Sequence, residues 1–303
     1  MRSAAVVGTG LIGTSIALAL TGRGVDTYLL DRDPQAAATA AAIGAGTAGR
    51  PAAPVDLAVI AVPPRHTGAV LREAQLSSLA RYFTDAASVK AGPQQEAAER
   101  GCDLTRYVGG HPMAGSERSG PLAARADLFH GRPWVLTPSV HSREDAVRSA
   151  LELVHLCGAR PLTMAHTEHD RAVALTSHAP HLVSSLLAAR LLVGDEAHLR
   201  VAGQGLRDAT RIAGGDSGLW TDILGSNAAA VADILSELAL DLDVVLAALR
   251  DLGSGDPQAR RRASAEIGAA LKRGAEGQAR IPARAPADRE AAGWQLSGAS
   301  APA

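Results

Sequence analysis

Reactive side chains gather in four short segments of the 303-residue chain. The segments are Asp85-Ala-Ala-Ser88-Val-Lys90, Gly109-Gly-His111-Pro-Met-Ala-Gly-Ser-Glu117, Ser177-His178-Ala-Pro-His181 and Asp208-Ala-Thr-Arg211. His111 stands between a glycine and a proline, a frame that would fix its imidazole as the acceptor of a hydroxyl proton while the adjacent carbon gives up a hydride. Ser88 can hydrogen-bond that hydroxyl or the imidazole, whereas we expect Lys90 to be an exposed lysine at a helix start. The pattern predicts a dehydrogenation, for which the chain needs a hydride acceptor.

A glycine fingerprint near the N-terminus predicts that acceptor. An apolar strand leads into Gly8-Thr-Gly10-Leu-Ile-Gly13, the GxGxxG spacing of a dinucleotide-binding unit. Gly8 permits the tight turn, Gly10 lets the backbone approach a pyrophosphate, and Gly13 lets the next helix pack closely on the strand. The N-terminus of that helix then binds the anion.

The second strand of this unit ends at Asp31, near the position where an acid meets the ribose in such folds. A carboxylate there accepts hydrogen bonds from both ribose hydroxyls and repels a 2′-phosphate, which favours NAD over NADP. Arg32 opposes this inference, because its guanidinium could pair with a phosphate. The predicted cofactor site consists of Gly8, Gly10, Leu11, Ile12, Gly13, Asp31 and Arg32.

Alternating strand and helix patterns position these segments as far as residue 164. Continuous apolar runs such as 55–62 are typical of parallel strands buried on both faces. The alternation predicts an α/β fold with a Rossmann-type doubly wound sheet. Ligands bind at the carboxyl ends of such strands, so Ser88 and His111 should reach the same edge as the cofactor.

Helical patterns replace the strand signals after residue 165, at 171–193, 198–212, 219–230 and 231–252. We therefore expect a dinucleotide-binding Rossmann domain at 1–164, an all-helical substrate and dimerisation domain at 165–273, and a polar, poorly ordered tail at 274–303. The helical part has more apolar residues than one buried stripe needs. This excess predicts a homodimer formed through the helical domain.

The composition argues against several other classes of partner. The net charge is −1 and aromatic residues make up 3% of the chain, so we expect no nucleic acid partner. No apolar run is long enough to predict a transmembrane span, so we expect no membrane partner. Cys102 and Cys157 form no spaced pair, which indicates reduced thiols in a cytoplasmic protein. Histidines between 166 and 181 resemble metal ligands, but Pro180 interrupts their helix and hydride transfer needs no metal, so we predict none.

Five segments together resemble the prephenate dehydrogenase family, including its arogenate-using members. They are GTGLIG, DAASVK, GGHPMAGSERSG, HDRAVALTSHAPH and RDATRIAGGDSGLW. The resemblance covers roughly residues 4–250, and HPMAGSE with the spaced SHAPH is far more specific than the glycine fingerprint. It implies oxidative decarboxylation of prephenate to 4-hydroxyphenylpyruvate with hydride transfer to NAD+, a step of tyrosine biosynthesis.

The resemblance also implies roles for individual residues. His111 matches the family's catalytic histidine and Ser88 its assisting serine. Arg211 matches a carboxylate-binding arginine, which suits a dianionic or zwitterionic substrate because guanidinium and carboxylate pair in a bidentate manner. His181 matches a histidine near the substrate side chain. The expected substrate-binding set is Arg211, His181, His178 and Glu117.

Three alternatives remain open from the sequence. An arogenate dehydrogenase would make tyrosine directly and would need a pocket for an ammonium, for which an acid such as Glu117 could serve. A β-hydroxyacid dehydrogenase or imine reductase would share both domains, but the HPMAGSE segment argues against it. A non-catalytic dinucleotide-binding protein would have no reason to keep Ser88, His111 and Arg211 together.

Overall fold

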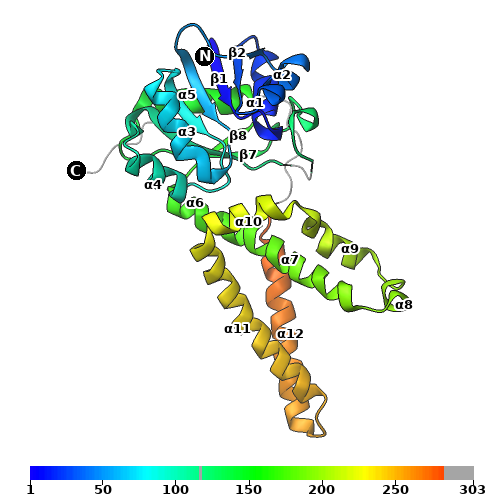
Figure 1. Cartoon of the computed structure of the whole chain (residues 1–303). Coiled ribbons are helices and arrows are strands. Elements are labelled where there is room, and N and C mark those ends of the chain that lie inside the picture. The colour runs from blue at the N-terminus through cyan, green and yellow to red at the C-terminus, as the bar shows by residue number, and fades with distance from the viewer. Residues whose placement is uncertain (116–117, 283–303) are drawn as a thin grey trace, which may run out of the picture. The chain divides into compact units, whose positions relative to one another are not determined.

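The computed structural model of the chain describes residues 1–115 and 118–282. It divides into two compact units, Met1–Val244 and Val245–Ala303. The first unit contains one sheet and the helices that surround it, followed by further helices (Figure 1). The sheet has eight strands, which are β1 (Ser3–Val7), β2 (Asp26–Leu30), β3 (Thr47–Ala48), β4 (Val55–Ile60), β5 (Ala80–Asp85), β6 (Tyr107–Pro112), β7 (Pro133–Thr137) and β8 (Arg160–Thr163).

The strand order in the sheet is β3-β2-β1-β4-β5-β6-β7-β8. From β1 the chain builds outward in one direction through β2 and β3, then returns to β4 and builds in the other direction. The β1/β4 boundary is therefore a switch point, where the carboxyl ends of the strands open a crevice for ligands. All neighbouring strands are parallel except β6 and β7, which are antiparallel. The doubly wound sheet is confirmed, with β3 and β7 as strands that the sequence patterns did not indicate.

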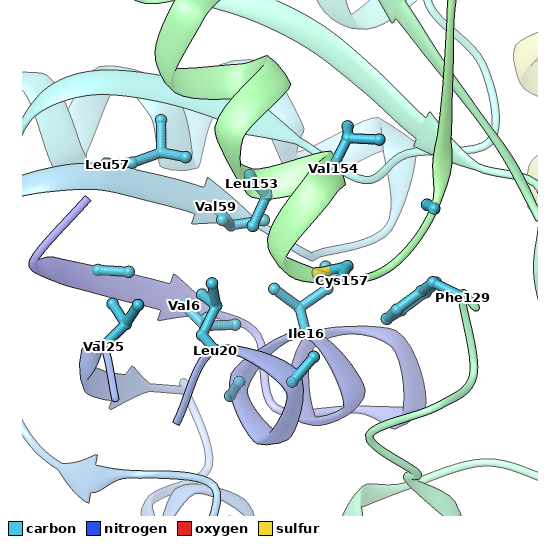
Figure 2. Packing of buried hydrophobic residues seen from close by; sticks show 14 of the residues in the cluster. Val6, Ile16, Leu20, Val25, Leu57, Val59, Phe129, Leu153, Val154 and Cys157 are labelled. Atoms are coloured by element: carbon cyan, nitrogen blue, oxygen red, sulfur yellow. The ribbon is translucent and has the colours of Figure 1, made fainter. Parts of the chain in front are cut away.

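Helices cover both faces of this sheet. Successive residues of a strand point to opposite sides, and both sides carry apolar residues that need to be buried. Along β1, Val6 belongs to one apolar core and Ala5 to the other. Val6 packs with Leu20 of the first helix and Leu153 of the fifth (Figure 2). Ala5 belongs to a core with Leu71 of the third. The helices around the sheet are α1 (Leu11–Thr21), α2 (Pro34–Ala42), α3 (Pro64–Leu76), α4 (Ala91–Glu99) and α5 (Glu144–Leu156), with short 3-10 turns η1 (Leu104–Arg106) and η2 (Pro121–Ala123).

After β8 the described chain is helical, as the sequence predicts. The helix expected at 171–193 is divided into four segments, which are the end of α6, η3, α7 and η4. The first division arises because a π-helical turn widens the chain just before Pro180 and lets the proline start a new helix. The elements are α6 (His166–Val173), η3 (Ala174–His178, the π turn), α7 (Ala179–Ala189), η4 (Arg190–Val193), α8 (Glu196–Leu199), α9 (Gln204–Thr210), η5 (Arg211–Gly214), α10 (Ser217–Ser226), α11 (Ala228–Leu252) and α12 (Pro257–Ala279). The division expected at 164/165 falls between β8 and α6 and stays a prediction.

The last described helix corrects one expectation. The side chain of Asp256 accepts a hydrogen bond from the amide of Gln258 and caps α12, which continues to Ala279. The tail expected from residue 274 is therefore wrong for 274–279, where good helix formers and a Lys272–Glu276 pair of 3.9 Å extend the helix. Residues 283–303 of that tail lie outside the described residues. Among the helices that are described, none combines the length and apolarity needed to cross a membrane.

Candidate active site

The glycine loop between β1 and α1 has the geometry that a dinucleotide pyrophosphate requires. Gly8 has a φ of +101°, and a Cβ there would lie 2.4 Å from the carbonyl oxygen of the residue that follows β4. A Cβ on Gly13 would lie 1.9 Å from the carbonyl oxygen of Gly8, so only glycine lets α1 pack this closely. A Cβ on Gly10 would meet nothing within 4 Å, and α1 begins at Leu11 without a side-chain cap. The first amides of α1, including those of Leu11 and Ile12, are thus left for an anion.

A cavity of about 650 Å³ adjoins this loop and is lined by Asp31, Arg32 and Arg50. The Asp31 carboxylate accepts hydrogen bonds from the amide and hydroxyl of Thr9, at 2.6 and 2.9 Å, and from the amide of Asp33 at 3.0 Å. Burial acts to raise the pKa of Asp31, but these hydrogen bonds outweigh it and lower the pKa below its usual range. An ionised carboxylate at the end of β2 suits the ribose of a dinucleotide.

His111 takes part in a hydrogen-bonded chain that sequence reasoning missed. It lies near the end of β6, and its Nδ1 is 2.8 Å from Nε2 of His169. His169 comes from α6 and is fully buried. Its Nδ1 lies 2.7 Å from Oδ1 of Asp170. Two imidazoles and a carboxylate therefore form a continuous chain from the sheet edge into α6.

The Asp170 carboxylate is held in place by the start of α4. Its Oδ1 accepts the amide of Lys90 at 2.7 Å and its Oδ2 the amide of Ala91 at 2.8 Å. The side-chain amide of Asn227 donates to the backbone carbonyl of Asp170 at 2.7 Å. Burial acts to raise the pKa of Asp170, but the hydrogen bonds from His169 and the two amides lower it on balance. The group is therefore a carboxylate, which only accepts hydrogen bonds.

Lys90 is buried, so the expectation of an exposed lysine is wrong. Its side chain is paired with Asp85 at the end of β5, and its ammonium also donates to the carbonyl of Gly110 at 2.5 Å. The hydroxyl of Tyr107 donates to the other oxygen of Asp85. These partners explain how the ammonium can lie inside the protein. Burial lowers the pKa of Lys90, and the charge of Asp85 opposes that shift.

The environment of His111 favours a neutral imidazole. Burial lowers the pKa of His111 well below its ordinary value of 6.5, and the neighbouring His169, Lys90 and His178 act in the same direction. At neutral pH the ring is therefore uncharged, with one nitrogen held by His169. The other nitrogen can act as a base.

A second group of aromatic and polar side chains lies in the helical part. The ring of His181 stacks on Trp220, with centroids 3.5 Å apart and planes at 13°. His178 meets the same indole edge-on, and its Nδ1 lies 3.1 Å from the side-chain amide of Asn227. Burial lowers the pKa of His178 to about 4 and lowers that of His181 as well. Asn227 also binds Asp170, so this group is connected to the chain that ends at His111.

Two family models together match most of the chain. The nucleotide-binding domain of prephenate dehydrogenase matches residues 16–163, and the dimerization domain of prephenate dehydrogenase matches residues 165–257. The chain belongs to the prephenate dehydrogenase family. It is 45% identical over 285 residues to the probable prephenate dehydrogenase NovF of Streptomyces niveus, which covers 94% of this chain and 78% of that protein.

Solved structures of the family share this fold. Prephenate dehydrogenase from A. aeolicus, in complex with hydroxyphenyl propionate and NAD+, matches with a TM-score of 0.79 at 25% identity, over 93% of this chain and 99% of that one. Arogenate dehydrogenase of Synechocystis matches with a TM-score of 0.70 at 25% identity, over 89% and 99% of the two chains. The family expected from the sequence is thereby confirmed.

The structure does not connect all of the predicted site residues to His111. Ser88 is half-buried in the turn between Asp85 and Lys90, and Arg211 is exposed at the start of η5. In the part of the chain that the structure describes, neither side chain is hydrogen-bonded to His111. Glu117 lies outside the described residues. The roles expected for these side chains therefore stay predictions.

His169 and Asp170 are the functional candidates that sequence reasoning passed over. The only signal is an adjacent histidine and aspartate near the start of the first helix after the sheet. The sequence suggested them as metal ligands, a role that we rejected, and the family resemblance implied for Asp170 only a part in shaping the helical domain. Across residues 1–115 and 118–282, no group of three or more side chains is arranged to hold a metal ion. Cys102 and Cys157 are buried free thiols, and the cytoplasmic location expected from them stays a prediction.

Proposed function

We propose that this member of the family is an NAD-dependent prephenate dehydrogenase, which converts prephenate to 4-hydroxyphenylpyruvate by oxidative decarboxylation. One observation carries the proposal. A neutral, half-buried imidazole, His111, lies near the carboxyl end of β6 in the sheet whose other strand ends form the dinucleotide site. A hydroxyl-bearing substrate between them would have a base for its proton on one side and the hydride acceptor on the other.

The residues around the crevice fit a dinucleotide. The glycine loop leaves room at Gly10 for a pyrophosphate, the amides of Leu11 and Ile12 would bind it, and Asp31 would accept the ribose hydroxyls. Bound NAD+ supplies the acceptor for the hydride. The ionised Asp31 supports NAD as the preferred cofactor, because a 2′-phosphate would be repelled. Arg32 is the residue that would weaken this preference.

A side chain of this protein accepts and returns the proton of the ring hydroxyl. His111 accepts the proton of the ring hydroxyl through the nitrogen that His169 does not hold, as the carbon that bears the hydroxyl loses its hydride. The ring carboxylate then leaves as carbon dioxide, and its bonding electrons make the ring aromatic. The new phenol oxygen takes the proton back from His111. No net proton is released, and aromatisation makes the reaction effectively irreversible.

Substrate binding is assigned to the helical part and to the turn after β5. We propose that Arg211 binds a substrate carboxylate, since its exposed guanidinium is accessible to an incoming anion. The neutral ring of His181, stacked on Trp220, would lie near the substrate side chain with His178 behind the same indole. Ser88 would hydrogen-bond the reacting hydroxyl. Glu117 completes the set as the family resemblance implies.

We also propose that the protein is a homodimer. Residues 165–257 match a model described as a dimerization domain. Large apolar side chains are exposed on α7 and on the first part of α11, which suits an interface between two copies. They include Leu186, Leu187, Leu240 and Leu242.

The first experiment measures the appearance of reduced nicotinamide with prephenate or arogenate and with NAD+ or NADP+. We expect turnover with prephenate and NAD+. His111→Asn should lower kcat by about 10²–10⁴-fold without changing NAD+ affinity. Arg211→Ala should chiefly raise KM for the substrate.

Each other outcome has a distinct meaning. Turnover with arogenate alone would move the substrate assignment to arogenate, and turnover with NADP+ alone would contradict the role given to Asp31. No turnover with any of the four pairs would refute the proposed function. Near-normal kcat in His111→Asn would refute the role of His111 as base.

A further inference from the structure

The hydrogen-bonded chain from Asp170 to His111 determines where the protons of two imidazoles lie. The Asp170 carboxylate can only accept, so the Nδ1 atom of His169 that it contacts carries a hydrogen. In a neutral His169 the Nε2 atom then has no hydrogen and is an acceptor. The Nδ1 atom of His111, 2.8 Å away, must therefore donate. This leaves Nε2 of His111 without a hydrogen.

We propose that Asp170 and His169 are positioning residues that hold His111 in the tautomer whose Nε2 can accept the substrate proton. What Nε2 then does rests on the proposed function, whereas the tautomer itself does not. Without His169 the imidazole of His111 could carry its proton on Nε2 instead. In that tautomer the free nitrogen would be Nδ1, and the base would be lost.

The carboxylate at the end of the chain is itself fixed, which makes the arrangement specific. Both oxygens of Asp170 accept backbone amides at the start of α4, from Lys90 and Ala91. The carboxylate therefore cannot turn away from His169 without breaking these bonds. This is the logic by which a buried acid orients a catalytic histidine, here extended by one additional imidazole.

The proton balance of the step needs no further group. The O–H bond of the substrate hydroxyl breaks and an N–H bond forms at Nε2 of His111. At the same time the hydride leaves the carbon that bears this hydroxyl. His111 is then an imidazolium whose Nδ1–H bond to His169 strengthens. No proton passes to His169 or Asp170, and the imidazolium loses its Nε2 proton to the phenol oxygen.

Several charged or titratable groups lie around His111. Lys90 approaches from the start of α4 and His178 from η3, and both oppose an imidazolium. Asp85 at the end of β5 neutralises Lys90 and also accepts the hydroxyl of Tyr107. Asp170 is the remaining negative group. The transient positive charge on His111 is therefore stabilised mainly through His169 and Asp170.

Nitrogen-15 spectra of the histidine rings test the proposal without substrate. The full-length protein is labelled at its histidines and measured at pH 8, with the His111 signals assigned from His111→Asn. We expect His111 and His169 both to carry hydrogen on Nδ1 and none on Nε2. His169→Leu, which removes the acceptor, should move His111 toward protonation at Nε2. His169→Gln offers an amide oxygen at a similar distance and should restore the Nδ1–H form.

Kinetics provide the second measurement. His169→Leu should lower kcat by roughly 10²-fold with little change in KM, and His169→Gln should recover part of that loss. Asp145→Asn is the matched control, because Asp145 is a partly exposed ion-pair partner of Arg148 on α5. This substitution should leave spectra and kcat unchanged.

A wild-type His111 with its hydrogen on Nε2 would overturn the proposal. So would a His169→Leu protein in which the tautomer of His111 is unchanged. If the protein turns over neither prephenate nor arogenate, the spectra still decide the tautomer, so this failure is distinct from failure of the proposed function.

Discussion

Breaking the buried ion pair of Asp85 and Lys90 should destabilise the protein strongly, and Asp85→Asn tests this. Asp85 is inaccessible to solvent and Lys90 is 2% exposed. The substitution keeps the shape of the side chain and the hydroxyl contact of Tyr107, but it removes the negative charge that faces the ammonium. Lys90 then retains the carbonyl of Gly110 as an acceptor.

Two limiting cases bound the loss of unfolding free energy in Asp85→Asn. If Lys90 stays charged, an uncompensated buried charge destabilises a protein by about 3–5 kcal/mol. If it loses its proton instead, keeping a lysine with an ordinary pKa of 10.5 neutral at pH 7 costs about 5 kcal/mol. Both limits predict that Asp85→Asn lowers the free energy of unfolding by about 3–5 kcal/mol at pH 7. If Lys90 is neutral in the folded variant, its side chain binds a proton only when the chain unfolds. The stability of the variant then rises as the pH increases toward 10.5.

Urea unfolding followed by tryptophan fluorescence is a suitable assay, because Trp134 of β7 is completely buried. The double variant Asp85→Asn/Lys90→Met removes both charges and should recover much of the loss. Asp145→Asn, at an exposed ion pair, should have little effect. The reasoning is refuted if Asp85→Asn loses no more stability than Asp145→Asn, or if the double variant is no more stable than Asp85→Asn.

Two further predictions concern pH and assembly. His178 is neutral when folded, with a pKa of about 4 against 6.5 when unfolded, so the unfolded state gains the proton and stability is lost as the pH falls from 6.5 to 4. The loss from this residue is at most about 3 kcal/mol, and His178→Gln should flatten the measured pH dependence of unfolding by that amount; an unchanged slope would contradict the assignment. Light scattering of the purified protein should give the mass of two chains, and Leu186→Glu with Leu187→Glu should shift it toward one; a wild-type mass of one chain at micromolar concentration would disprove the dimer.

Much of the fold was predictable because the signals are local. Strands β1, β2 and β4 are short apolar runs, and the glycines between β1 and α1 are required by contacts within a few residues or with the next strand. The short β3 and the antiparallel β7 were not predictable in this way, because β3 has only two residues and β7 depends on pairing with β6. The extension of α12 to Ala279 depends on helix propensity that outweighs its glycines.

The site was predictable in part for the same reason. His111 lies near a strand end, a position that the alternation of strands and helices indicates. His169 contacts His111 across 58 residues of sequence, and Lys90 is buried because its partners Asp85 and Gly110 come from two different strands. No local pattern encodes such pairings. A lysine next to a helix start has an exposed environment in most proteins, and only the tertiary contacts reverse that expectation.

The same buried network also explains how α6 can be placed accurately against the sheet. A partly satisfied polar network inside a protein is worse than an apolar one, since each unpaired group costs about 1–3 kcal/mol. Here the carboxylate of Asp170 binds two amides and one imidazole, and both nitrogens of His169 are engaged. Sliding α6 by one turn would leave the amides of Lys90 and Ala91 without their acceptor. Because one register satisfies every group, the contacts that orient His111 also select the position of the helix that supplies them.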